Sequence, residues 1–91
     1  MSAQEKDEKE KLSVSITAPA GSLFQGTADF LQIPGREGVL GITPHHTRLV
    51  SLLRQGDIII KNEGQTPQTF LITEGILQIN REEIEIVVNT P

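Results

Sequence analysis

Residues 33–47 read IPGREGVLGITPHHT, and this stretch decides how the chain around it folds. Within a few positions it holds four residues that form turns, Pro34, Gly35, Gly38 and Gly41. Glycine permits positive φ and proline lacks an N–H donor, so the stretch excludes a helix. It predicts a tight loop, a very short strand over 39–42 and a second bend. Because loops on a rigid scaffold often bind partners, this stretch is the first candidate for a binding site.

The segments on both sides of this stretch have the pattern of β-strands. From Leu12 to Ala18 apolar residues alternate with hydroxyl residues, which is the period of a strand with one buried face. Leu23 and Phe24 are expected in a bend, with Phe24 filling the core. Further strands are predicted over 27–33, 48–53, 57–61, 70–73, 76–79 and 84–88, with Gly, Pro and Asn between them. Residues 48–53 also fit helical spacing, but Pro44 and Gly56 leave little length for a helix. The predicted fold class is therefore all-β, an antiparallel sandwich or flattened barrel.

Composition excludes several classes of protein. The chain has 91 residues and no Cys, so disulfides, thiolate metal sites and Cys nucleophiles are absent. Its net charge is −4 and its basic residues are scattered, whereas nucleic-acid binding needs a basic stripe. No apolar run approaches the roughly 20 residues of a membrane span, and the N-terminus is too charged for a signal peptide. We expect no nucleic acid as a partner and no span through the bilayer.

The chain divides into two parts. Residues 1–11 mix both signs of charge and hold no apolar residue worth burying, which is typical of a solvated tail, although a helical interaction arm is an alternative. Residues 12–91 form the predicted sandwich domain.

Motifs for catalysis or metal binding are weak. His45 and His46 are adjacent, and adjacent residues of an extended chain point to opposite faces, so a metal site would need an irregular backbone and a third ligand such as Glu37 or Asp57. Ser51 has no nucleophile elbow around it. Glu82, Glu83 and Glu85 are expected on a turn and on the outer face of a strand. We therefore expect no catalytic residue, no metal and no cofactor, and an interaction module remains.

The motifs together resemble the N-terminal β-sandwich domain of the epsilon subunit of F-type ATP synthases. The resemblance runs from about Leu12 to Thr90, and it rests on LFQG at 23–26, PGREGVLGITPHHTRL at 34–49, Gly56 before a strand, and FLITEGILQI at 70–79. It implies about ten short strands in two sheets. Most bacterial members continue into a helical hairpin that binds ATP in some of them. The resemblance here is to the short form, for which we expect no C-terminal helical domain and no ATP binding.

The resemblance also implies a function and partners. In this family the domain is a non-catalytic part of the rotor in the central stalk, where it couples the gamma subunit to the polar loops of the c-ring. One copy per complex is implied, monomeric when isolated and peripheral at the cytoplasmic face of the bacterial inner membrane. The coupling ion is decided elsewhere, in the ring.

The contact residues follow from the same resemblance. His46 matches the histidine that the family places near gamma, and Ser51 lies in the same neighbourhood. Val39 stands where many relatives have an acidic residue, which leaves an apolar contact. The loop and short strand that face the c-ring match at Gly35, Glu37, Gly38, Leu40, Gly41 and Ile42, and Arg36, Val39 and Pro44 complete the candidate contact.

Two other functions are weaker interpretations of the sequence. A stand-alone β-sandwich that binds a small ligand or carbohydrate would need exposed aromatic residues, and this chain has three Phe and no Trp or Tyr. An enzyme is the more distant alternative.

Overall fold

The computed structural model describes residues 11–44 and 48–91. These residues form nine strands and no helix. The strands are β1 (Leu12–Ala18), β2 (Gly21–Ala28), β3 (Phe30–Gly35), β4 (Gly38–Ile42), β5 (Leu49–Leu53), β6 (Gly56–Lys61), β7 (Gln68–Ile72), β8 (Glu74–Asn80) and β9 (Glu83–Asn89).

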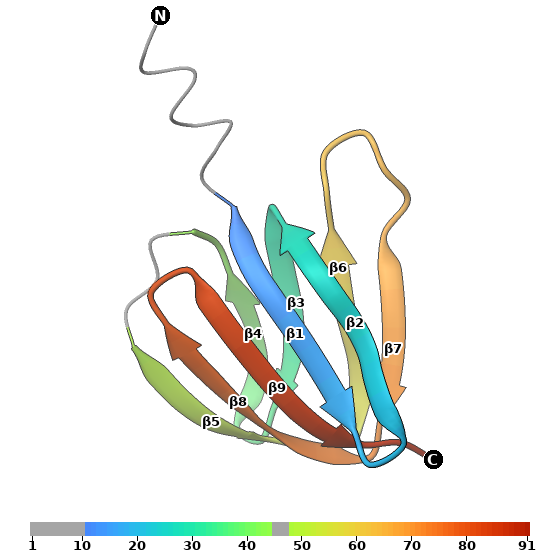
Figure 1. Cartoon of the computed structure of the whole chain (residues 1–91). Coiled ribbons are helices and arrows are strands. Elements are labelled where there is room, and N and C mark those ends of the chain that lie inside the picture. Colours follow the sequence, from blue (N-terminus) through green and yellow to red (C-terminus); the bar gives the residue numbers. More distant parts are fainter. Residues whose placement is uncertain (1–10, 45–47) are drawn as a thin grey trace, which may run out of the picture.

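The strands make one continuous sheet that curls back on itself. Its order is β2-β1-β9-β8-β5-β3-β6-β7, and β4 pairs with the other edge of β3. In Figure 1, β2, β1, β9, β8 and β5 form the front layer, and β4, β3, β6 and β7 form the fainter layer behind it. The predicted all-β sandwich or flattened barrel is therefore confirmed, with nine strands in the described residues against the expected ten or so.

One pair of strands departs from the antiparallel arrangement. β1 and β9 are parallel, with Val14 opposite Ile84 and Ile16 opposite Ile86. They are the first and last strands, so no hairpin turn dictates their relative direction.

The strand predicted over 27–33 is wrong in its bounds, because the chain bends at Asp29. There the Asp29 N–H donates to Asn62 Oδ1 and the Asp29 carboxylate accepts from the Glu63 N–H. These bonds separate β2 from β3. Leu23 and Phe24 lie inside β2 rather than in a bend. The ambiguous segment 48–53 is a strand, as predicted.

The core consists of aliphatic side chains between the two layers. β1 and β9 bury every second residue, in the alternation that the sequence predicts. Among the described residues no polar or charged side chain is buried. The largest fully buried side chains are Leu12, Ile16, Leu31, Ile33, Ile42, Ile58, Ile60, Ile72, Leu77, Ile79, Ile84 and Ile86. Packing of this kind gives a stiff body on which surface residues keep fixed positions.

Candidate functional site

The candidate stretch forms a tight hairpin at one end of the molecule. β3 and β4 pair from Leu31–Ile42 to Gly35–Gly38, so only Arg36 and Glu37 lie in the turn. A Cβ at Gly35 would lie 2.6 Å from the Gly38 carbonyl oxygen, and Gly38 has φ +145°. Both positions therefore require glycine, which is why the sequence turns here.

The turn is fixed to the neighbouring strand β5. The Arg36 N–H donates to the Leu52 carbonyl at 2.9 Å, and the Arg54 N–H donates to the Pro34 carbonyl at 3.0 Å. Gly35 and Leu53 are the bridge partners between these bonds. The two layers are thus joined through main-chain atoms beside the hairpin turn.

Most of the candidate residues line one concave surface, which we call the edge trough. It lies between β4 and β5 and has a volume of about 610 Å³. Its lining consists of Gly35, Arg36, Glu37, Gly38, Val39 and Leu40 from the hairpin and of Leu49, Val50, Ser51 and Leu52 from β5. The structure thus brings Ser51 beside the hairpin although the two are far apart in the sequence.

The other candidate residues lie elsewhere. Ile42 is buried in the core, so its side chain supports β4 from behind. Gly41 is exposed on β4, and a Cβ there would lie 3.0 Å from the Phe30 ring. Pro44 is half-buried and does not line the trough. His46 lies outside the described residues, as does His45, so the metal interpretation of this pair has no geometry to examine.

A row of exposed apolar side chains was missed by the sequence analysis. Leu52 of β5 pairs with Ile76 of β8, and Ile76 pairs with Val87 of β9. Their exposed fractions are 47%, 50% and 60%, and Val50, two residues before Leu52, is 68% exposed. We call Leu52, Ile76 and Val87 the apolar row.

A signal for the apolar row was present in the sequence. Ile76-Leu77 and Ile86-Val87-Val88 break the alternation of apolar and polar residues. Because a strand with one buried face turns successive residues to opposite sides, one residue of each run must face solvent.

The apolar row is part of a second concave surface, the outer hollow. This hollow has a volume of about 480 Å³ and a mostly apolar lining. Arg36 and Leu52 line both the outer hollow and the edge trough. The two concave surfaces therefore meet at the hairpin turn and make one continuous surface.

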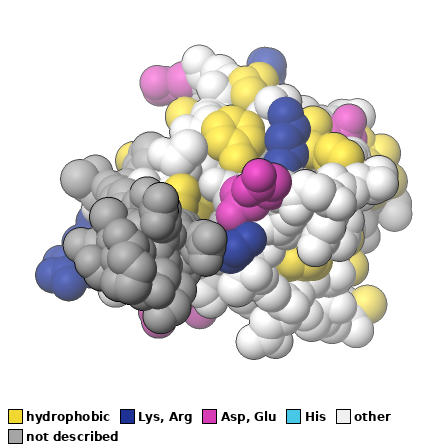
Figure 2. All heavy atoms as spheres, turned by 90° about the horizontal axis from the view of Figure 1, so that it is seen from above, with side chains coloured by type: hydrophobic (Ala, Val, Ile, Leu, Met, Phe, Trp, Pro, Cys, Tyr) yellow, Lys and Arg dark blue, Asp and Glu magenta, His cyan; other side chains and the backbone are white. Residues whose placement is uncertain are grey.

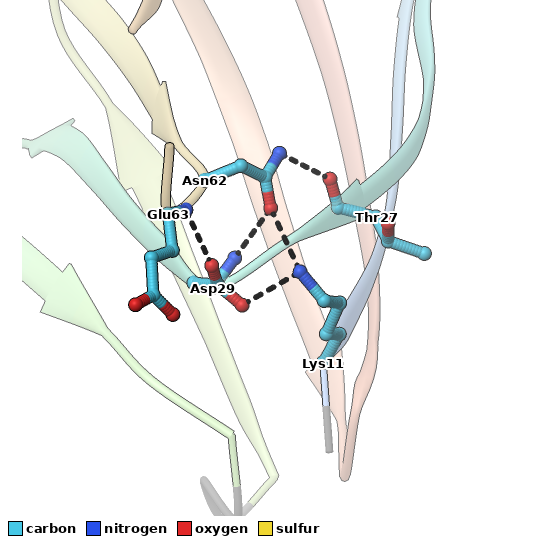
Figure 3. A network of polar contacts seen from close by, with 5 residues as sticks. All are labelled: Lys11, Thr27, Asp29, Asn62 and Glu63. Carbon is cyan, nitrogen blue, oxygen red and sulfur yellow. Dashed lines mark hydrogen bonds and ion pairs between the residues drawn. The ribbon is translucent and has the colours of Figure 1, made fainter. Parts of the chain in front are cut away.

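A polar network lies at the opposite end of β3 from the hairpin turn. Lys11 Nζ lies 2.8 Å from Asp29 Oδ1, and Asn62 Nδ2 donates to the Thr27 carbonyl (Figure 3). The hydrogen bond from Lys11, together with the bond from the Glu63 N–H, lowers the pKa of Asp29. Lys11, which the sequence analysis placed in the tail, is thus bound to the domain.

Seen from above, this end of the molecule mixes both signs of charge. Acidic and basic side chains lie close together among hydrophobic and uncharged atoms (Figure 2). Such mixing differs from the extended basic surface that phosphate binding needs.

Two features of the described residues bear on metal binding and on the Ser51 hydroxyl. Residues 11–44 and 48–91 contain no cluster of three metal-ligating side chains. The Ser51 hydroxyl donates to the Leu52 carbonyl, 3.2 Å away. Within the same ranges no helix has the length and apolar character to cross a membrane. What the geometry offers is a contact surface.

The comparison with known families identifies this kind of domain. Residues 11–91 match the family described as "ATP synthase, Delta/Epsilon chain, beta-sandwich domain". The chain belongs to this family. Its curled nine-stranded sheet is the β-sandwich of the description, and the resemblance seen in the sequence is confirmed.

Individual relatives agree with the family. ATP synthase epsilon chain 1 of Methylococcus capsulatus is 33% identical over 79 residues, which cover 87% of this chain and 56% of the relative. A mitochondrial ATP synthase structure from Euglena gracilis, described as OSCP/F1/c-ring, has a chain that matches with a TM-score of 0.80 at 20% identity. The match covers 87% of this chain and 51% of that chain.

A second structure shows the same fold. It is the central stalk/c-ring of the Tetrahymena thermophila mitochondrial ATP synthase, with a TM-score of 0.68, 22% identity, and coverage of 88% and 64%. At these identities the two structures establish the fold alone. The chain spans only about half to two thirds of the length of these relatives.

Proposed function

We propose that this chain is a non-catalytic subunit of the central stalk of an F-type ATP synthase, which couples the gamma subunit to the c-ring. The observation that carries the proposal is the continuous surface of the edge trough and the outer hollow on a stiff sandwich. Family membership and the epsilon-chain relatives support it. A part that transmits torque needs two contact surfaces held rigidly relative to each other, and a close-packed core provides that rigidity.

The two ends of this surface suit two different partners. Arg36 and Glu37 in the hairpin turn are exposed, so they fit contact with the polar loops of the c-ring. The apolar row and Ser51 fit a longer apolar contact with gamma. In this proposal the subunit is peripheral at the cytoplasmic face of the bacterial inner membrane, with one copy per complex.

A stand-alone module for small ligands or carbohydrates fits the structure less well. Its recognition would rest on exposed aromatic side chains in a concave site. All three Phe of the chain are half-buried, and none lines the edge trough or the outer hollow. Phe24 and Phe70 pack against each other with their ring centroids 6.0 Å apart, and Lys61 Nζ lies over the Phe30 ring.

The test is recovery of partner subunits with two matched variants. Ile76→Asp places a charge in the apolar row, and Leu71→Asp places the same charge on β7 in the other layer, where the side chain is similarly exposed (50% and 52%). We expect Ile76→Asp to reduce co-purification of gamma from source-cell membranes by roughly tenfold or more, the effect of losing an interface hot spot.

The control must behave differently from the test variant. Leu71→Asp should co-purify with gamma, alpha and beta as the unchanged chain does. If the unchanged chain recovers none of these subunits, the stalk function is wrong. If both variants recover gamma normally, the apolar row is not its contact.

A further inference from the structure

The curled sheet leaves two seams between its layers, and they are closed differently. Where β2 meets β7, Phe24 and Phe70 fill the seam and the Asn62 amide donates to the Thr27 carbonyl at 3.0 Å. Where β4 meets β5, the corresponding side chains are Leu40 and Leu49, which pack on the core but remain half-exposed. The second seam is the edge trough, so the core is open along it.

On the β5 side, the trough is bordered by main-chain groups that no strand of residues 11–44 and 48–91 pairs. The Leu52 carbonyl accepts from the Arg36 N–H, so it points away from β8. The N–H and C=O of alternate residues point to the same side of a strand. Val50 therefore also turns its N–H and C=O away from β8 and toward the trough.

The β4 side has the same character. Pro34 has no N–H, and its carbonyl accepts from the Arg54 N–H, away from β4. Its partner Val39 is thus in a non-hydrogen-bonded pair and directs its own N–H and C=O away from β3. The same holds for Gly41, two residues further on. Within the described part of the chain, two unpaired strand edges consequently border one trough, and we call them the free edges.

The lining of the trough is uncharged along the strands. β4 is GVLGI and β5 is LVSLL, and the charges of the lining, Arg36 and Glu37, lie at the turn end. Proteins usually protect free edges with charged residues or proline, and these two edges have neither. The complementary surface is an uncharged strand with apolar side chains at alternate positions.

Other occupants satisfy the trough less well. A helix already pairs its own main-chain groups and would leave those of Val39 and Val50 without protein partners. A second copy of this chain pairing through the five-residue β4 would cover far less than the roughly 800 Å² per partner of a standard interface. An extended segment of a larger partner uses both the edges and the apolar lining.

We infer that the edge trough binds an extended segment of the partner subunit by strand addition, with main-chain hydrogen bonds to Val39 and Gly41 on β4 or to Val50 and Leu52 on β5. The inference rests on the proposed function, in which this partner is gamma. An apolar side chain of the added strand packs between Leu40 and Leu49 and completes the core.

The test uses a proline at a free edge position. Val50→Pro removes an N–H that points into the trough and leaves the hydrogen bonds between β5 and β8 in place, and an unpaired edge position of this kind accepts proline. Val50→Thr is the control, since it keeps the N–H and the β-branched shape. Each variant is titrated with purified gamma, and amide exchange of the isotope-labelled chain is measured with and without gamma.

We expect gamma to slow amide exchange at the free-edge positions of β4 or of β5 by roughly tenfold or more. Val50→Pro, or the matching variant Val39→Pro on β4, should weaken the binding of gamma by a similar factor, whereas Val50→Thr should not. Binding of gamma without protection of either edge, or equal affinity of both proline variants and the control, would overturn strand addition and leave the stalk function standing. Failure of the unchanged chain to bind gamma would overturn both. If the free-edge amides are protected from exchange in the chain alone and its native mass is twice that of one chain, the trough is occupied by a second copy. That result would also overturn the inference.

Discussion

Single residues set both ends of the sandwich. At one end Gly35 and Gly38 permit a two-residue turn, and at the other Lys11, Asp29 and Asn62 join β1, the β2–β3 bend and the segment after β6 (Figure 3). Lys11 belongs to a run of charges that resembles a solvated tail, and its contacts with Asp29 and Asn62 show that this residue is part of the domain.

The ion pair at Asp29 predicts a dependence of stability on pH. The folded state lowers the pKa of Asp29 below its ordinary value of 3.8, so its contribution is complete above that value and is lost as pH falls through the folded pKa. The pair is about one third exposed, so the contribution is about 0.2–1 kcal/mol. Urea unfolding of the unchanged chain and of Asp29→Asn should differ by this amount at pH 7 and at pH 5. The difference should shrink below pH 4, and a constant difference down to pH 2 would contradict the assignment.

At the scale of elements, the β3–β4 hairpin depends on the close approach of its two ends. The short strand 39–42 and its turn could be predicted from the sequence, because glycine and proline act locally. The bend at Asp29 could not, because the groups that hold it, Asn62 and Glu63, are more than thirty residues away. Exposed apolar residues on β8 and β9 had a local signal in the sequence, but their alignment with Leu52 in one row depends on the pairing of β5, β8 and β9.

The geometry of the β3–β4 hairpin predicts that one added methyl group at Gly35 lowers the free energy of unfolding markedly. In Gly35→Ala the new Cβ would lie 2.6 Å from the Gly38 carbonyl oxygen, so the backbone must shift. We expect a loss of about 1–3 kcal/mol in the free energy of unfolding, the range for overpacking. Arg36→Ala, in the exposed turn, should change it by less than about 0.5 kcal/mol. Equal midpoints in urea for the two variants would contradict the turn geometry.

At the scale of the whole molecule, the buried core and the edge trough differ in their relation to partner chains. The seventeen buried apolar residues of the described chain surround the inside of the curl and need no partner. The apolar row and the edge trough lie outside it, and in the proposed function another chain covers them.

The isolated chain should nevertheless be a monomer. Its exposed apolar residues are distributed over both layers, and a patch of a few hundred Å² is normal for monomeric proteins. Sedimentation equilibrium at about 10–100 μM should give the mass of one chain, with Ile76→Asp indistinguishable from the unchanged protein. A dimer that Ile76→Asp dissociates would show that the apolar row is an interface between copies.

The sequence by itself determined the all-β class, most strand positions, the hairpin turn and the family, because alternation and turn-forming residues act over a few neighbours. The eleven predicted contact residues, among them Gly35, Val39 and Ser51, were named from the family resemblance. Only the tertiary structure decided that the hairpin and Ser51 border one trough, that β4 and β5 keep free edges there, and that Leu52, Ile76 and Val87 form a row. The physical reason is that each of these features is a relation between strands, and pairing between distant strands is set by how the whole sheet closes around its core.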